Sequence, residues 1–276
     1  MNCTTLTSDL IAQPRLWRLS MLVDDAAVTV AARSSVDDAG LITARLPFDD
    51  TITSRAKALE EVVYANPLLL SDFGHVDVVV RTDKVTIVPA EAVPDEEACS
   101  AVAALLWPEA EAAVSAVMLP DGYAMVASID EGTRRFVART FNNPPLLPHM
   151  AVLVRYFALK ARRGNTAKIY VYLRPDALDV VALGSQGLMA ATTYHCDPKS
   201  DDATYYVLAL AKQCGFDLDR DELLVCGDGA ARAVLLPQLR RFVANAMPLI
   251  LPLGGIGAAS QDVARVPFEL LILPLL

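Results

Sequence analysis

Two stretches of sequence with the same pattern decide the fold. They are LWRLSMLVDDAAVTVAAR at residues 16–33 and KIYVYLRPDALDVVALG at residues 168–184. In both, runs rich in Val, Leu and other residues that favour extended backbone flank a short acidic turn. The turn is Asp24-Asp25 in the first stretch and Pro175-Asp176 in the second. The pattern predicts two β-hairpins about 150 residues apart, as expected of an internal repeat.

The elements that follow each hairpin repeat in the same order. After the first hairpin the sequence predicts a strand at Leu41–Phe48, a helix from Thr51 to Asn66 capped by Asp49-Asp50, and a strand at Val76–Arg81. After the second it predicts a strand at Leu188–His195, a helix that opens at Ser200 and ends at Gly215, and a strand at Glu222–Cys226. The offset between matching elements is about 150 residues throughout, which indicates duplication of one α/β unit.

The remaining segments are expected around these two units. A further hairpin is expected at Ala113–Leu119 and Tyr123–Ile129, followed by helices over Gly132–Phe141 and from Pro148, and a late helix over residues 232–246. Two more strands are expected, one at Lys84–Val88 in a hairpin with Val76–Arg81 and a buried one in the tail at Phe268–Leu273. The break at Asn143-Pro144-Pro145 predicts two domains, at residues 14–145 and 146–276.

Composition and charge narrow the function classes. The chain has 276 residues, of which 54% are apolar, enough for a core in each half. Its net charge of −9 argues against nucleic-acid binding, which requires clustered basic residues. The densest basic group, Lys160, Arg162, Arg163 and Lys168, lies where a helix is expected to end, and cations are favoured there.

Cysteine usage and hydropathy bear on location. The five cysteines include no Cys-x-x-Cys pair, which favours free thiols in a reducing compartment and hence a cytoplasmic location. The segment Phe242–Gln261 has no charged residue, but Pro248, Pro252 and three glycines interrupt it. We therefore expect a buried strand and a loop in this segment, and no membrane span.

Three strands, a helix, a strand and a helix, occurring twice, form the layout of the actin-like ATPase superfold. Two local sequences add to this layout: VTIVP at residues 85–89, and DDATYYVL at 201–208 followed by LLVCG at 223–227. Together they resemble a bacterial family of uncharacterised proteins with an actin-like (actin/Hsp70/sugar kinase) ATPase fold. The fold class implied is α/β, a duplicated actin-like ATPase (ribonuclease H-like) fold whose two domains each have a mixed sheet flanked by helices.

The resemblance implies where nucleotide phosphates would bind. Active members of the superfold hold phosphates at the two hairpin turns with an Asp-x-Gly pattern, because a glycine lets backbone N–H groups approach the phosphate oxygens. The first turn here has Ala26 after Asp24-Asp25, where the pattern has glycine. The second turn, Arg174-Pro175-Asp176-Ala177, has no glycine, and its proline has no N–H to donate. Both turns therefore lack features that phosphate binding requires.

A third nucleotide motif of the superfold, on the adenosine side, falls at residues 226–230. Gly227, Asp228 and Gly229 lie there between a strand and a helix. The same glycines are also ordinary turn residues, and this second interpretation is favoured. The acidic run Asp217-x-Asp219-x-Asp221 lacks the glycine and glutamate of a calcium loop, so no metal site is expected there.

Three functions remain open. The leading hypothesis is a non-catalytic actin-like scaffold or interaction protein that has lost ATP hydrolysis, uses no cofactor and binds an unidentified protein partner. The alternative is a residual nucleotide-binding or sugar-kinase-like phosphotransferase that uses the interdomain cleft, with Gly227, Asp228 and Gly229 on the nucleotide and Asp24 or Asp25 near a metal. The third is a small-molecule sensor in the same cleft.

Overall fold

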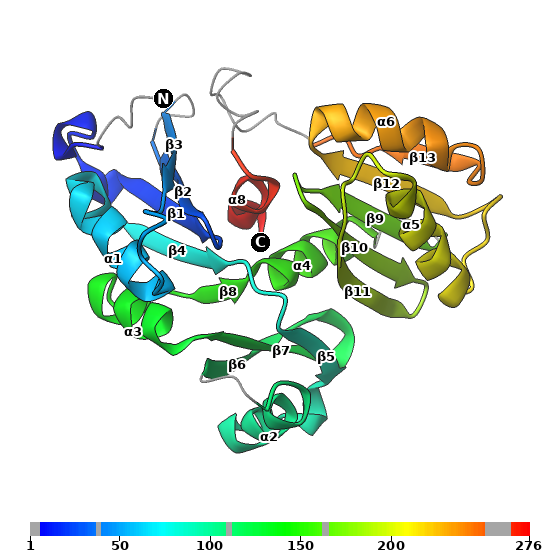
Figure 1. Cartoon of the computed structure of the whole chain (residues 1–276), viewed down its shortest axis with the longest axis horizontal. Helices are drawn as coiled ribbons and strands as arrows, with labels where there is room; N and C mark the ends of the chain where they lie inside the picture. Colours follow the sequence, from blue (N-terminus) through cyan, green and yellow to red (C-terminus); the bar gives the residue numbers. More distant parts are fainter. Residues whose placement is uncertain (1–5, 37–39, 109–111, 162–165, 252–265) are drawn as a thin grey trace. The chain divides into compact units, whose positions relative to one another are not determined.

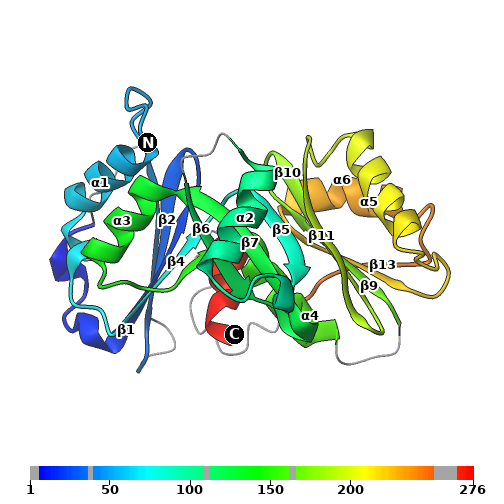
Figure 2. The same cartoon turned by 90° about the horizontal axis from the view of Figure 1, so that it is seen from below.

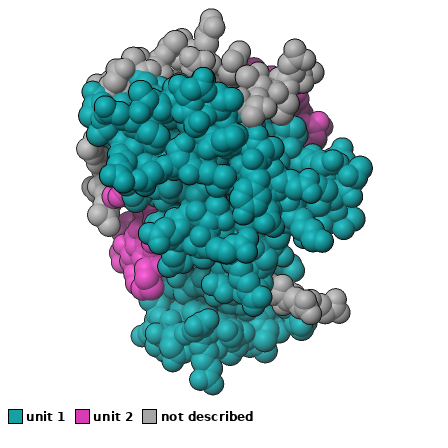
Figure 3. All heavy atoms as spheres, turned by 90° about the vertical axis from the view of Figure 1, so that its left-hand side faces the viewer, with its two compact units in different colours: residues 1–117, 124–149, 253–274 teal, residues 118–123, 150–252, 275–276 magenta. Residues whose placement is uncertain are grey.

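The computed structural model describes residues 6–36, 40–108, 112–161, 166–251 and 266–276. The chain divides into two compact units (Figure 3). Unit 1 comprises Met1–Val117, Ala124–His149 and Leu253–Pro274, and unit 2 comprises Met118–Tyr123, Met150–Pro252 and Leu275–Leu276. The division into domains at residues 14–145 and 146–276 stays a prediction.

Unit 1 is built on a mixed five-stranded sheet with the order β3-β2-β1-β4-β8 (Figure 1). Its strands are β1 (Trp17–Val23), β2 (Ala27–Ser34), β3 (Leu41–Pro47), β4 (His75–Val80) and β8 (Leu146–Pro148). The first three strands are antiparallel neighbours, as the hairpin pattern predicts, whereas β4 runs parallel to both β1 and β8.

Unit 2 repeats this sheet with the order β11-β10-β9-β12-β13. Its strands are β9 (Lys168–Leu173), β10 (Ala177–Gly184), β11 (Gly187–His195), β12 (Glu222–Gly227) and β13 (Asn245–Pro248). The pairings have the same senses, antiparallel among β9, β10 and β11 and parallel from β9 to β12 and β13. The predicted duplication is therefore confirmed strand by strand.

Helices cover both faces of each sheet. In unit 1, α1 (Arg55–Ala65) and α3 (Glu131–Thr140) lie side by side on one face (Figures 1 and 2), and the short α8 (Phe268–Ile272) lies on the other. In unit 2, α5 (Asp201–Gln213) and α6 (Gly229–Leu239) cover one face, and α4 (His149–Ala161) stacks Phe157 on Tyr170 of the other, with ring centroids 4.3 Å apart. The central strands β1, β2, β9 and β10 are buried along almost their whole length, as expected of strands that are covered on both faces.

A smaller sheet interrupts the repeat in unit 1. It has the order β5-β7-β6 and is formed by β5 (Val85–Pro89), β6 (Ala112–Met118) and β7 (Tyr123–Asp130), with α2 (Glu96–Leu106) packed on it through Cys99 and Val102. In the second half β12 leads directly into α6, so this sheet is an insertion in the first half only. Short 3₁₀ turns lie at Ser8–Leu10, Pro14–Leu16, Pro67–Leu70, Ala90–Ala92, Pro120–Gly122 and Leu273–Leu275.

Several expected elements are corrected by the structure. The tail is the helix α8, because an apolar run of this length has no period that separates a buried strand from a buried helix. β5 joins the inserted sheet and forms no hairpin with β4. The helix α1 begins at Arg55, where the Ser54 side chain accepts a hydrogen bond from Lys57 N.

The late helix and the uncharged segment also differ from expectation. α6 ends at Leu239, and the residues up to 246 turn into the edge strand β13, which is half-exposed at its start and exposed at its end. The loop expected within Phe242–Gln261 lies mostly outside the described residues. Among the helices in the described ranges, none combines the length and apolar character needed to cross a membrane.

One ion pair ties neighbouring strands of unit 2 together. Glu222 of β12 lies opposite Lys168 of β9 in the parallel ladder, with Glu222 Oε2 2.6 Å from Lys168 Nζ. Hydrogen bonds from Lys168 and then from Thr166 lower the pKa of the Glu222 carboxyl from its usual value of 4.5. A lowered carboxyl pKa stabilises the fold above that usual value and ceases to do so as the pH falls through the lowered one.

We predict that Glu222→Gln lowers the free energy of unfolding of unit 2 by about 1–3 kcal/mol at pH 7, because it leaves the buried Lys168 ammonium without its carboxylate. The difference from the wild type should vanish as the pH is lowered below 4.5. Urea unfolding followed by circular dichroism measures the effect. Both tryptophans, Trp17 and Trp107, lie in unit 1 and report on that unit separately. An equal difference at pH 7 and pH 3 would contradict the assignment.

Candidate functional site

The first hairpin turn is closed by its own acidic side chain. Asp24 N donates to Ala27 O at 3.0 Å, which sets the turn. The amides of Ala26 and Ala27 both donate to Asp24 Oδ1, at 2.9 and 2.8 Å. These are turn N–H groups of the kind that phosphate oxygens accept from in the active superfold. The carboxylate of Asp24 therefore occupies the donors that a phosphate would need.

Arginines from other elements neutralise this turn. Arg45 of β3 places Nη1 2.9 Å from Asp24 Oδ2. Arg55, at the start of α1, places Nη1 3.0 Å from Asp25 Oδ1 and donates through Nη2 to the carbonyls of Val23 and Arg81. Each carboxylate of the turn thus has a guanidinium partner, and a role for Asp24 or Asp25 near a metal ion stays a prediction.

Arg81 extends the network from the turn to the C-terminal helix. It follows β4 and places Nη1 3.6 Å from Asp24 Oδ2. Its Nε and Nη2 both donate to Oε1 of Glu269 on α8, at 3.1 and 2.9 Å. The side chain of Glu269 is fully buried, so this is a desolvated ion pair that would be costly to break. The turn, β4 and α8 of unit 1 are in this way held as one charged cluster.

At the second hairpin turn a basic side chain, and not an acidic one, is neutralised by its neighbours. Arg174 N donates to Ala177 O at 2.9 Å, which matches the closure of the first turn. The Arg174 side chain is buried and pairs with the fully buried Asp179 of β10, with Nε 3.2 Å from Oδ2. Thr193 of β11 donates to the other oxygen of Asp179 at 2.6 Å. Because Pro175 has no N–H, this turn also offers few donors to a phosphate.

The two halves carry opposite charges at matching positions. Asp24 and Arg174 each follow the first strand of their sheet. Arg81 and Asp228 each follow the fourth strand of their sheet, and each donates its backbone N–H to the last residue of the first strand. Arg81 N donates to Val23 O at 2.9 Å, and Asp228 N donates to Leu173 O at 3.0 Å. Unit 1 therefore has an acidic residue after its first strand and a basic residue after its fourth, whereas unit 2 has a basic residue after its first strand and an acidic residue after its fourth. The backbone of the repeat is kept, while the side chains at its two turns have reversed sign.

The glycine loop of unit 2 is explained by backbone geometry. Gly227 has a φ of +97°, and a Cβ on it would collide with the carbonyl oxygen of Leu173. Asp228 caps α6 by accepting from Ala231 N at 2.7 Å. Asp130 caps α3 of unit 1 in the same way, from Thr133 N at 2.6 Å. These roles require no ligand, and a nucleotide role for Gly227, Asp228 and Gly229 stays a prediction.

The structure groups the residues that the sequence singled out. Asp24 and Asp25 share the turn in unit 1, whereas Gly227, Asp228 and Gly229 lie in unit 2, beside the second turn through Leu173. Sequence reasoning missed the three arginines that pair with the first turn, Arg45, Arg55 and Arg81, and it missed Glu269, which pairs with Arg81. Two of them carried a signal, a charge inside an otherwise apolar run, in Ala44-Arg45-Leu46 and in Phe268-Glu269-Leu270.

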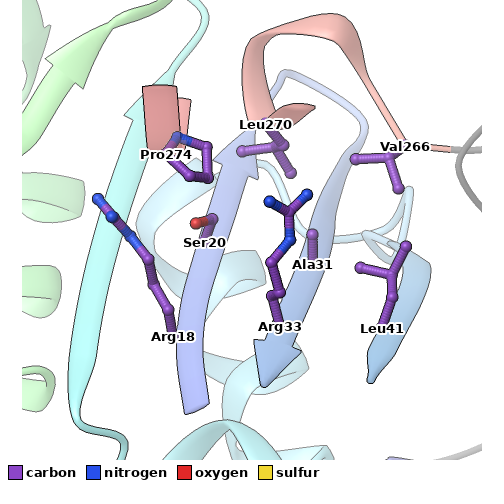
Figure 4. A pocket seen from close by; sticks show the side chains of 8 residues that line it. All are labelled: Arg18, Ser20, Ala31, Arg33, Leu41, Val266, Leu270 and Pro274. Carbon is purple, nitrogen blue, oxygen red and sulfur yellow. The ribbon is translucent and has the colours of Figure 1, made fainter. Parts of the chain in front are cut away.

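A small pocket in unit 1 lies between α8 and the sheet, and Figure 4 shows Arg18 and Arg33 in its wall beneath Leu270 and Pro274. Arg18 is already bound to Asp77, with Nε 2.6 Å from Oδ2. In the ranges that the structure describes, no group of three or more His, Cys, Asp or Glu side chains is placed to hold a metal ion.

Comparison with known proteins agrees with this architecture. Residues 12–246 match the model of a family described as "Protein of unknown function (DUF3822)". No curated protein matches the chain. A solved structure from Bacteroides thetaiotaomicron VPI-5482, described as a protein with actin-like ATPase fold and unknown function, is 20% identical over 92% of this chain and 97% of that one, with a TM-score of 0.75.

A second solved structure, from a PilM-PilN type IV pilus biogenesis complex, is 12% identical. It covers 93% of this chain and 96% of its own, with a TM-score of 0.58. At these identities the likeness shows the fold alone. The expected fold class, a duplicated α/β chain with the actin-like ATPase fold, is thereby confirmed.

We predict that Glu269→Gln lowers the stability of unit 1 by about 3 kcal/mol, as for a buried ion pair that loses one partner. Urea unfolding followed by tryptophan fluorescence, which reports on unit 1, measures the loss. Asp72→Asn is the matched control, because the Arg15–Asp72 pair has a similar distance of 2.7 Å but lies at the surface and should contribute little. Equal effects of the two substitutions would show that the buried pair has no special role.

The two glycines of the loop give a second, paired prediction. Gly227→Ala should destabilise unit 2 by about 1–3 kcal/mol, because alanine is strained at positive φ and its Cβ meets the backbone of Leu173. Gly229→Ala should leave stability unchanged or raise it by up to about 1 kcal/mol, since nothing lies within 4 Å of the added Cβ. Thermal unfolding followed by circular dichroism compares the two. A Gly227→Ala variant as stable as wild type would contradict this account.

Proposed function

Since the chain belongs to the DUF3822 family of proteins of unknown function, we propose a function from the state of its hairpin turns. In this proposal the chain is a non-catalytic actin-like protein that has lost ATP hydrolysis and acts as a scaffold for a protein partner. The observation that carries the proposal is the occupation of the first turn, whose amides donate to Asp24 Oδ1.

Electrostatics supports loss of phosphate binding at that turn. A phosphate could reach the amides of Ala26 and Ala27 only after the Asp24 carboxylate left them and left Arg45. A carboxylate and a phosphate at one site repel each other, so the first excludes the second. Pro175 and the buried Arg174–Asp179 pair support the same conclusion for the second turn. The residues present at the two turns therefore do not fit a nucleotide's phosphates.

A role in binding other proteins accounts for a fold kept without its chemistry. A solved chain with this fold is part of a complex described as the PilM-PilN type IV pilus biogenesis complex, and a scaffold role for the present chain follows the same use of the fold. The proposal includes a cytoplasmic location. The four cysteines in the described ranges form no disulfide bond, as expected in a reducing compartment.

The alternative, a residual nucleotide binder or sugar-kinase-like phosphotransferase, is favoured by one observation. Gly229 opens α6 with empty space beside it, and a helix N-terminus of this kind attracts anions. Gly227 is unsuitable for testing this alternative because its own backbone geometry requires glycine. Gly229 is suitable, since a larger side chain there disturbs no neighbour.

We predict that ATP, ADP and their magnesium complexes at millimolar concentration leave the melting temperature unchanged and that no ATP is hydrolysed. Differential scanning fluorimetry and phosphate release measure the two outcomes. The reason is that Asp24 occupies the amides of the first turn and that the second turn, with Pro175, has few donors for the phosphates. Gly229→Glu serves as the comparison, because an acidic residue in the first turn of a helix is compatible with the fold. A rise in melting temperature with ATP that Gly229→Glu abolishes would overturn the proposal and establish the alternative.

A further inference from the structure

The strand β11 forms an open edge of the unit 2 sheet. It is the first strand in the order β11-β10-β9-β12-β13, and the described residues place no further strand beside it. It has nine residues, none of them Asp, Glu, Lys, Arg or Pro. Residues 190–194 are half-exposed. Such an edge presents backbone N–H and C=O groups to which another strand can pair.

The repeat supplies an internal comparison for this edge. The register places Arg45 and Pro47 of β3 where β11 has Thr193 and His195. Charge and proline are the devices by which proteins protect an edge from pairing. Unit 1 therefore protects the edge that unit 2 leaves unprotected. The opposite edges, β8 and β13, have three and four residues and end in Pro148 and Pro248.

Acidic side chains lie at both ends of β11. Asp121 touches Gly187 at its start. Asp197, Asp201 and Asp202 are exposed just beyond its end, and the one cation among them, Lys199, leaves this end with a net negative charge. Burial, followed by the charges of Asp202 and Asp197, raises the pKa of the Cys196 thiol, so the field of these acids reaches the end of the strand. The edge is thus an uncharged strand between two negative ends.

This charge distribution indicates which kind of strand can pair with the outer edge of β11. If a second copy paired by an antiparallel two-fold, the terminal acids of each β11 would face Asp121 of the other, and each chain has a net charge of −9. Like charges placed opposite one another on strands are destabilising. A strand with basic residues at both ends would instead be attracted to β11, because its positive charges would lie beside the acids at each end of that strand.

We propose that the outer edge of β11 binds an extended segment of a partner protein by strand addition, and that this segment has apolar or β-branched residues flanked by Lys or Arg. The inference rests on the proposed function and names the class of partner that the scaffold takes. Backbone hydrogen bonds to β11 supply binding, and the acids at its ends supply the preference for basic flanks.

Peptides of alternating Val and Thr are the probes for this surface, one with two Lys at each end and one with two Glu. Fluorescence anisotropy should give at least about tenfold tighter binding for the Lys-ended peptide, as complementary charge across an interface implies. A Lys-ended peptide that is N-methylated at alternate residues keeps its charge but loses its backbone donors, and it should also bind about tenfold more weakly. Amide hydrogen exchange of Met189–His195 should slow when the unmethylated peptide binds.

A matched pair of variants locates the contact. Thr192→Lys puts a charge on the β11 edge and should weaken binding at least about tenfold, as charges on edge strands do. Ala116→Lys makes a comparable change on β6, another uncharged edge strand, and should leave binding unchanged. Melting temperatures of both variants near that of the wild type establish that each is folded.

Each other outcome overturns this inference. No binding of the Lys-ended peptide, equal binding of the methylated one, or loss of binding in Ala116→Lys rather than Thr192→Lys would remove β11 as the docking edge. Sedimentation that shows dimers dispersed by Thr192→Lys would assign the edge to a second copy. Absence of peptide binding together with an absence of any nucleotide effect would leave the scaffold proposal in place and reject this surface alone.

Discussion

The arrangement around the first turn follows from one requirement, which is that the backbone amides of Ala26 and Ala27 need a hydrogen-bond acceptor. Asp24 supplies it from within the turn, and its remaining oxygen then requires positive charge. Arg45 and Arg81 provide that charge, and Arg81 in turn requires Glu269. Through these contacts one carboxylate fixes the ends of the central strands and the position of the last helix. The same contacts leave the turn with little capacity for an external anion.

The repeat shows that the backbone and the turn chemistry have separate constraints. The two sheets have the same strand order and senses because each needs the same hydrogen-bonded ladder. Their turns reverse the order of acid and base, because each turn has only to be neutral within itself. Arg174 with Asp179 satisfies that condition in unit 2, and Asp24 and Glu269 with Arg45 and Arg81 satisfy it in unit 1. Conservation of fold here carries no implication of conserved chemistry.

Most of the fold could be predicted from the sequence, because hairpins, periodic helices and a constant offset are local signals. The hairpin strands and α5 lie close to their expected ranges. The helix α8 could not be predicted, because its buried apolar run fits a strand equally well until its partners are known. The network around Asp24 was also beyond prediction, since Arg81 and Glu269 are 188 residues apart and the unusual charge of Glu269 in an apolar run does not say which residue it pairs with. The turns could be located, but what neutralises them depends on tertiary contacts.

The connectivity of α4 and α8 has a consequence for synthesis of the chain. The helix α4 follows the last strand of unit 1, but apart from its first residue it belongs to unit 2. The helix α8 follows the last strand of unit 2, but it belongs to unit 1. Domains commonly fold in order as they leave the ribosome. Unit 1 cannot be finished in that order, because Arg81 meets Glu269 only when the final residues have emerged. A chain that stops before Glu269 would therefore lack the partner of Arg81 and be incomplete in unit 1.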